Sequence, residues 1–392
     1  MYYPRLIEPA LKKNLKNKQA VIVTGMRRVG KTTLLRHLFE SVPANKVWFD
    51  FENPLDIKQF EDIDYNDVYK NIIRQGNLDS GKRIFVFIDE VQWFPEISKI
   101  VKYLIDHYEV KFFLTGSASY YLKNLFPESL AGRKVIFELF PLDFEEFLLF
   151  KGEDIDRYNT IRKKKKHTLL EYELYDAYYQ EFMDWGGFPE VALESKNSIK
   201  RSRLDDIFSS YYQQEILHLA DYRKSHKVRD LLILLAVRAG SQLDLVKLSQ
   251  ELQVTRATIY SYLSFLKDTY FIRLISPFSR SRDREISGTQ KVYMCDAGIL
   301  NIMAQVNRGQ VLENTVFNQL RARGTLHYFR KKTGAEIDFI LNKKTAYEVK
   351  YTASPTDIIT MKRGIQTAKI KTGFVVSKQF VEGQNIILAP FL

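Results

Sequence analysis

Short apolar runs alternate with helical patterns over the first part of the chain. The runs are rich in Val, Ile, Phe and Leu, and they cover residues 21–24, 46–51, 84–89, 111–115 and 135–139. Runs of this length are typical of strands buried on both faces, and strands that alternate with helices form parallel sheets. The pattern therefore predicts an α/β fold in which residues 1–145 form a parallel sheet flanked by helices.

Three further segments follow, each with its own pattern. Residues 146–215 are rich in Tyr, Glu and Lys and show no clear strand pattern, which favours a helical subdomain. Residues 216–285 carry a helix-turn-helix pattern and then a hairpin pattern. Residues 286–392 return to an α/β pattern, and we expect short strands near 326–330, 335–341, 345–351 and 373–376.

A phosphate-binding loop follows the first strand pattern directly. Residues 25–32 read Gly-Met-Arg-Arg-Val-Gly-Lys-Thr and match the motif GxxxxGK[ST] at every fixed position. In such a loop backbone N–H groups point at phosphate oxygens, the lysine places its charge on the β- and γ-phosphates, and the last hydroxyl ligates Mg²⁺. The predicted nucleotide-binding residues are Gly25, Arg27, Arg28, Val29, Gly30, Lys31, Thr32 and Thr33. We expect ATP rather than GTP, because no guanine-reading NKxD motif is present.

Two acids stand at the end of the strand pattern of residues 84–89: Asp89 is its last residue, and Glu90 follows directly. This is the layout of a Walker B element. We expect Asp89 to reach the Mg²⁺ shell and Glu90 to polarise the attacking water. A further strand pattern ends in Thr115 and is followed by Ser117. Ser117 is our first choice for a side chain that senses the γ-phosphate, and Thr115 is the second.

Arg133 stands just before the last strand pattern of this domain. An arginine there can reach the γ-phosphate of a neighbouring subunit as a finger, which predicts a homo-oligomer formed through the ATP site. The alternative is a surface arginine in a turn.

A helix-turn-helix pattern occupies the middle of the chain. Residues 245–252 predict a short helix, residues 253–254 a turn, and Thr255 the N-cap of a second helix. In that second helix Arg256 and Tyr260 lie off the apolar stripe, so they would face the major groove of DNA if the helix were a recognition helix.

Residues 271–275 and 291–294 could form the wing of a winged helix. The loop between them carries Arg280, Arg282 and Arg284, which suit contacts with DNA phosphates. Asp283 and Glu285 dilute this positive charge. Winged helices also serve as protein-docking modules or spacers, so both interpretations stay open.

Two carboxylates near the C-terminus are expected on neighbouring strands. Asp338 and Glu348 have nine residues between them, and Lys350 lies on the same strand face as Glu348. Carboxylates so placed can hold Mg²⁺, and the lysine can stabilise a developing phosphorane charge. Glu313, on an expected helix, could add a third carboxylate. The alternative is a cross-strand ion pair with no catalytic role.

These motifs together resemble two known families. The first is the AAA+ ATPases of the archaeal and bacterial AAA_14 type, and the second is the DUF4143 type of PD-(D/E)XK nuclease-like domain. The resemblance is carried by residues 24–33, 87–92, 114–117, 130–133, 141–147 and 186–190, and by Asp338, Glu348 and Lys350 with Glu313-Asn314. It implies a P-loop AAA+ core (1–145), a helical lid (146–215), a winged helix-turn-helix (216–285) and a restriction-endonuclease-like domain (286–392).

Composition further restricts the kinds of partner and binding site that we expect. The chain is 45% apolar and 27% charged, as in a globular protein, and its net charge of +12 favours a polyanionic partner such as DNA. One cysteine excludes a disulfide framework and a Cys-rich zinc site. No apolar run is long enough to span a membrane and no signal peptide pattern opens the chain, so we expect a cytoplasmic protein with no membrane partner.

The leading hypothesis is an AAA+ ATPase whose ATP cycle controls DNA engagement by the winged helix and the nuclease-like domain. Two forms of this hypothesis stay open: either the nuclease-like domain cleaves DNA, or it only binds it. An alternative is an ATP-gated switch or scaffold that binds protein partners and has an inactive nuclease-like domain. A third hypothesis is a DNA-binding regulator whose slow ATPase serves as a timer.

Overall fold

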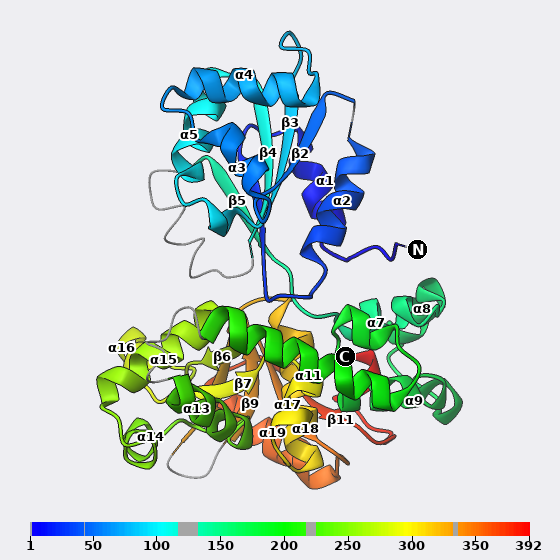
Figure 1. Ribbon diagram of the computed structural model, residues 1–392. Helices are drawn as coiled ribbons and strands as arrows, with labels where there is room; N and C mark the ends of the chain where they lie inside the picture. The colour runs from blue at the N-terminus through cyan, green and yellow to red at the C-terminus, as the bar shows by residue number, and fades with distance from the viewer. Residues whose placement is uncertain (1, 43, 117–131, 217–224, 332–335) are drawn as a thin grey trace. The chain divides into compact units, whose positions relative to one another are not determined.

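The computed structural model describes residues 2–42, 44–116, 132–216, 225–331 and 336–392. Its chain divides into two compact units (Figure 1). Unit 1 contains Met1–Phe140 and Asp268–Tyr270, and unit 2 contains Pro141–Lys267 and Phe271–Leu392.

Unit 1 is built on a parallel five-stranded sheet with the order β2-β3-β4-β1-β5. Its strands are β1 (Ala20–Thr24), β2 (Lys46–Asp50), β3 (Ile84–Asp89), β4 (Val110–Gly116) and β5 (Lys134–Glu138). Each of the five strands predicted from apolar runs is therefore confirmed. The three central strands are almost wholly buried, which is why they read as continuous apolar runs.

Helices cover both faces of this sheet (Figure 1). They are α1 (Glu8–Lys13), α2 (Lys31–Ser41), α3 (Pro54–Ile57), α4 (Tyr65–Gly76) and α5 (Ile97–His107), with short 3₁₀ turns at Asn14–Lys16, Lys58–Phe60 and Val91–Trp93. Because all five strands are parallel, their carboxyl ends meet at one edge of the sheet. The carboxyl ends of β1, β3 and β4 therefore lie close together there.

The first part of unit 2 is helical, as predicted. It contains α7 (Phe144–Phe150), α8 (Ile155–Arg162), α9 (Leu169–Trp185), α10 (Pro189–Ala192), α11 (Asn197–Tyr211) and a π-helical turn at Tyr212–Ile216. These helices share a core with the C-terminal part of the chain. The Tyr179 hydroxyl donates to Gln319 Oε1 at 2.8 Å, and the Tyr158 hydroxyl donates to the carbonyl of Pro390 at 2.7 Å. The role of this segment as a lid stays a prediction.

The middle of unit 2 contains α13 (Ser225–Val237), α14 (Leu245–Glu251) and α15 (Arg256–Asp268), followed by the antiparallel pair β6 (Ile272–Ile275) and β7 (Lys291–Met294). Helices α14 and α15 and the strand pair fall where the sequence predicts them.

The segment between β6 and β7 differs from its prediction as a loop. Residues Arg282–Ser287 form the short helix α16. Ser281 stands at the N-cap position, and Asp283 and Glu285 lie in the first turn, where acids interact favourably with the helix dipole. The acids that dilute the positive charge of this segment thus favour a helix.

The C-terminal part adds α17 (Ala297–Met303), α18 (Arg308–Arg321), α19 (Pro355–Ala368) and a 3₁₀ turn at Ala389–Phe391. A mixed sheet has the order β12-β11-β10-β9-β8. Its strands are β8 (Leu326–Arg330), β9 (Glu336–Leu341), β10 (Thr345–Lys350), β11 (Thr372–Ser377) and β12 (Ile386–Leu388). The first four are the predicted strands. The three-residue β12 was not predicted, because it is too short to show a pattern.

Candidate functional site

The phosphate-binding loop connects β1 to α2 at the carboxyl edge of the unit 1 sheet. Arg28 and Gly30 adopt positive φ angles of 62° and 94°, and Gly30 is the N-cap of α2. A side chain at Gly25 would place its Cβ 2.1 Å from the carbonyl oxygen of Leu139, so only glycine fits there. The loop therefore has the turn that brings backbone N–H groups and the start of α2 to one point.

Lys31 lies buried across this loop. Its Nζ donates to the carbonyl oxygens of Gly25 and Met26, each at 3.0 Å. Arg5 supports the loop from the N-terminal segment, since its guanidinium donates to the carbonyl of Val29 at 2.8 Å and to that of Phe140 at 2.8 Å.

Thr115 forms hydrogen bonds with Asp89, the last residue of β3, and with Glu90, which follows it. Its hydroxyl donates to the Asp89 carboxylate and accepts the backbone N–H of Glu90 at 3.1 Å. Burial raises the pKa of Asp89, and hydrogen bonds from the hydroxyls of Thr115 and Thr32 oppose that rise. The predicted ligands Thr32 and Asp89 are thus brought together at the sheet edge, and Thr115 completes the group.

Glu90 adopts a positive φ of 53°, and its carboxylate accepts a hydrogen bond from the Gln92 amide. Two further acids stand beside it. Asp50 is the register partner of Asp89, and the pKa of Glu52 is raised first by burial and then by the charges of Glu90 and Asp50. Sequence reasoning missed both, although Asp50 lies near the end of the predicted strand 46–51 and Glu52 directly follows it, where parallel strands commonly present polar side chains.

Mg²⁺ bound with ATP fits these residues. Thr32 and Asp89 offer hard oxygen donors, and Mg²⁺ commonly takes one or two protein ligands together with substrate phosphates and water. The Asp89 carboxylate is 3% exposed and has a raised pKa, so a nearby cation would favour its charged form.

Ser117, the first choice for the γ-phosphate sensor, lies outside the described residues, as does most of the segment that precedes Arg133. Arg133 itself stands before β5, at the edge of the sheet opposite to the phosphate-binding loop, because β5 runs parallel to β1 from the pair Ala20 and Lys134. Four residue steps of strand separate the edges by roughly 13 Å. Arg133 forms an ion pair with Asp106 at 2.7 Å. Its action as a finger toward a neighbouring subunit stays a prediction.

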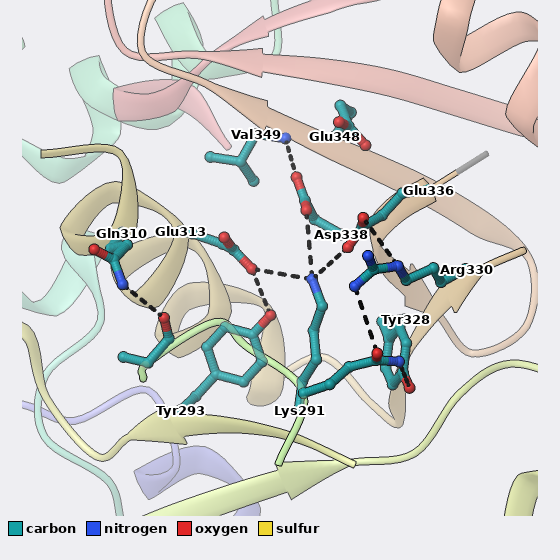
Figure 2. Close-up of polar contacts among 12 residues, drawn as sticks. Lys291, Tyr293, Gln310, Glu313, Tyr328, Arg330, Glu336, Asp338, Glu348 and Val349 are labelled. Atoms are coloured by element: carbon teal, nitrogen blue, oxygen red, sulfur yellow. Dashed lines mark hydrogen bonds and ion pairs between the residues drawn. The ribbon is translucent and has the colours of Figure 1, made fainter. Parts of the chain in front are cut away.

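Unit 2 contains a second group of charged residues, which we call the carboxylate cluster: Glu313, Glu336, Asp338 and Glu348 (Figure 2). Glu313 comes from α18, Glu336 and Asp338 from β9, and Glu348 from β10. Asp338 and Glu348 lie on adjacent antiparallel strands, one step beyond the pair Phe339 and Tyr347. The predicted grouping of Glu313, Asp338 and Glu348 is therefore present in the structure.

Lys291 lies in the middle of this cluster (Figure 2). Its Nζ is 3.1 Å from Glu336 Oε1, 3.6 Å from Glu313 Oε1 and 3.7 Å from Asp338 Oδ1. On the same strand, the Tyr293 hydroxyl donates to Glu313 Oε1 at 2.6 Å. Sequence reasoning missed Lys291, Tyr293 and Glu336 as members of this group. Glu336 could have been found, because it shares a strand face with Asp338 by its two-residue spacing.

Two other oxygens of the cluster accept hydrogen bonds from the chain, whereas Glu348 Oε2 is buried without a hydrogen-bond partner in the described part of the chain. Asp338 Oδ2 accepts the Val349 N–H at 2.8 Å, and Glu348 Oε1 accepts from Lys350 Nζ at 2.9 Å. Burial, followed by the charge of Asp338, raises the pKa of Glu313 and that of Glu348 to about 7 each. Among the described residues, no three Asp, Glu, His or Cys side chains are grouped so as to hold one metal ion.

The predicted DNA contacts lie on two helices of unit 2. Arg256 and Tyr260 are exposed on α15 and line a groove of about 980 Å³ together with Lys267. Ile286 of α16 lines the same groove. Arg282 and Arg284 are exposed on α16, and Arg280 is exposed just before it.

The sheet and loop of unit 1 define the class: this is an AAA-type P-loop ATPase fold. Residues 17–148 match the family model of an AAA domain, AAA_14, and residues 308–382 match a domain of unknown function, DUF4143. The chain thus has an AAA_14 domain at its N-terminus and a DUF4143 domain at its C-terminus, as predicted. Residues 176–310 match another domain of unknown function, DUF8612, which the sequence did not predict.

The chain is also similar to uncharacterized relatives over most of its length and to a solved structure in its fold. An uncharacterized protein of Methanocaldococcus jannaschii is 29% identical over 89% of this chain and 79% of its own length. One of Haemophilus influenzae is 25% identical over 93% of this chain and 92% of its own length. The Walker-type ATPase of Pyrococcus abyssi superposes with a TM-score of 0.50 at 17% identity, covering 77% of this chain and 96% of that one. At that identity the likeness concerns the fold alone.

No helix in the described part of the chain combines the length and the apolar character needed to cross a membrane.

Proposed function

We propose that the chain binds and hydrolyses ATP at the carboxyl edge of the unit 1 sheet and uses this cycle to control binding of DNA by α15 and the α16 segment. The observation that carries the ATPase proposal is the convergence of Lys31, Thr32 and Asp89 at one sheet edge, with Thr115 bonded to Asp89 and to the backbone of Glu90.

Each residue has a distinct task in this proposal. Lys31 leaves the loop carbonyls and neutralises charge on the β- and γ-phosphates. Glu90 orients the attacking water, and Thr115 fixes the backbone position from which the Glu90 side chain extends. Mg²⁺, held by Thr32 and Asp89, would neutralise negative charge on the phosphates.

The test is ATP binding and turnover by the Lys31→Ala variant, with Lys18→Ala as a matched control. Lys18 is an exposed lysine of the same unit, paired with Glu109 at 3.4 Å. We expect Lys31→Ala to lose ATP binding and turnover while Lys18→Ala retains both. Normal turnover by a folded Lys31→Ala protein would refute the ATPase assignment.

DNA binding is supported by the charges on α15 and α16. Within the described part of the chain, Arg256, Arg280, Arg282 and Arg284 form no ion pair, and Glu285 is instead paired with Lys343 at 2.7 Å. Positive side chains of this kind suit phosphate contacts, which weaken as salt rises. The net charge of +12 points the same way.

Two measurements test this second step. Fluorescence anisotropy with duplex DNA should show weaker binding and a smaller salt dependence for Arg256→Ala than for the control Arg201→Ala on α11. ATP turnover should also change when DNA is added. If turnover is indifferent to DNA and binding is weak at physiological salt, the ATP-gated switch that binds protein partners replaces this proposal.

A further inference from the structure

The carboxylate cluster of unit 2 contains its own cation. The Lys291 side chain is only 4% exposed, and its Nζ lies within 3.7 Å of oxygens from Glu313, Glu336 and Asp338. Burying an ammonium group without partners costs far more than a folded protein can tolerate, so these carboxylates are what allows Lys291 to be buried.

A divalent metal ion does not fit the same place. Mg²⁺ needs oxygen ligands at about 2.0–2.1 Å in an octahedral arrangement. The space between Glu313 and Asp338 holds the lysine ammonium, at 3.6 and 3.7 Å from their nearest oxygens. A divalent cation beside it would meet both steric overlap and charge repulsion.

Each predicted metal ligand also accepts a hydrogen bond from the chain through one oxygen, while Glu348 Oε2 is buried without a hydrogen-bond partner among the residues that the structure describes. Tyr293 donates to the Glu313 oxygen that faces Lys291, Val349 donates to the second oxygen of Asp338, and Lys350 donates to Glu348. These hydrogen bonds occupy one oxygen of each of the three predicted ligands. This agrees with the lack of a metal-binding group among the described residues.

We propose that Lys291 is the resident cation of the carboxylate cluster and takes the position in which a metal-dependent nuclease would hold its divalent ion. The cluster is metal-free, and it joins β7 to α18 and β9 within unit 2. Lys291 and Tyr293 lie two residues apart on one face of β7, so a single strand supplies both contacts to the cluster. This inference does not depend on ATP hydrolysis in unit 1.

The experiment measures Mn²⁺ binding by electron paramagnetic resonance to the nucleotide-free full chain. Four proteins are compared: wild type, Lys291→Met, Lys350→Met and the double variant Lys291→Met with Asp338→Asn. We expect no tight Mn²⁺ site in unit 2 of the wild type, and a gain of at least tenfold in Mn²⁺ affinity in Lys291→Met. The double variant should lose that gain, and Lys350→Met, which keeps Lys291, should not show it.

Thermal unfolding with and without Mn²⁺ covers the case in which Lys291→Met is unstable. A Lys291→Met protein that folds only when Mn²⁺ is present supports the proposal. Three results overturn it: a wild-type Mn²⁺ site that Asp338→Asn removes, metal-dependent DNA cleavage by the wild type that Asp338→Asn removes, or a folded Lys291→Met protein without a Mn²⁺ site.

Discussion

Thr115 shows how one hydroxyl can organise two acids. It bonds to the Asp89 carboxylate and to the backbone N–H of Glu90, so it holds both residues in place at the sheet edge. We predict that Thr115→Val lowers the kcat for ATP by about 10- to 100-fold with a smaller change in ATP affinity. Steady-state turnover and nucleotide titration measure the two effects, with Thr160→Val on α8 as a control. Equal kcat values for Thr115→Val and wild type would contradict this role.

Lys111 is a buried lysine near the amino end of β4, at the sheet edge opposite to the phosphate-binding loop. Burial, and then the charge of Arg83, lowers its pKa from 10.5 to about 7, and its Nζ donates to the Gln19 carbonyl. The unfolded chain therefore binds more protons than the folded chain between about pH 7 and 10.5, so this lysine makes the folded state more stable as pH rises through that range.

We predict that Lys111→Met is at its most stable relative to wild type near pH 7 and loses that advantage toward pH 10. Methionine carries no charge to desolvate, although it also loses the hydrogen bond to Gln19. Urea unfolding at pH 7, 8.5 and 10 measures the difference, and Lys18→Met serves as an exposed control. Parallel pH profiles for Lys111→Met and wild type would show that the buried charge has no such cost.

Residues with local patterns were predictable, and residues with distant partners were not. Lys31 and Thr32 follow from spacing within eight residues, and Asp89 follows from its place after an apolar strand. Lys291 gave no such signal, because its partners lie on α18 and β9, more than 20 residues further along the chain. Its place in the carboxylate cluster is defined only by the tertiary structure.

Among the secondary-structure elements, the strands of unit 1 were the most predictable. The three central strands, β1, β3 and β4, are buried on both faces and are long enough to show a largely apolar run. Helix α16 and strand β12 gave no usable pattern, since six and three residues are too few to reveal a period.

The cap of α17 illustrates an element that depends on distant residues. Asp296 accepts the N–H groups of Gly298 at 2.8 Å and Ile299 at 3.1 Å, and also that of Gly187, at 2.7 Å, from a far part of the chain. The carboxylate is buried, so if it were removed, these N–H groups would have neither the carboxylate nor water as a hydrogen-bond acceptor.

We predict that Asp296→Ala destabilises the protein by about 2–4 kcal/mol. Asp244→Ala is the matched comparison, because Asp244 caps α14 at an exposed position and has only local partners; its loss should cost about 1 kcal/mol. Urea unfolding gives both values. Equal losses in the two variants would mean that the bond to Gly187 contributes nothing.

At the scale of the whole molecule, the sequence predicted four segments and the structure groups its residues into two units. The helices of residues 144–211 share a core with the C-terminal strands through contacts such as Tyr179 to Gln319. A local pattern cannot indicate a contact between residues that are 140 positions apart in the sequence. The grouping into two units could therefore not be predicted from the sequence.

We predict that calorimetry of the full chain shows two unfolding transitions, one for each unit. ATP with Mg²⁺ should raise only the transition of unit 1, by about 2.7 kcal/mol at a ligand concentration of 100 times Kd. Lys31→Ala should show no such shift. A single transition, moved as a whole by ATP, would mean that the two units unfold together.

The division between the units has a practical consequence for expression. The backbone passes between them after Phe140, after Lys267 and again after Tyr270, because Asp268–Tyr270 belongs to unit 1 although it lies between α15 and β6. A gene truncated at residue 140 would therefore encode an ATPase unit without three of its own residues. Whoever wishes to crystallise the ATPase unit alone should graft that tripeptide or keep the chain whole.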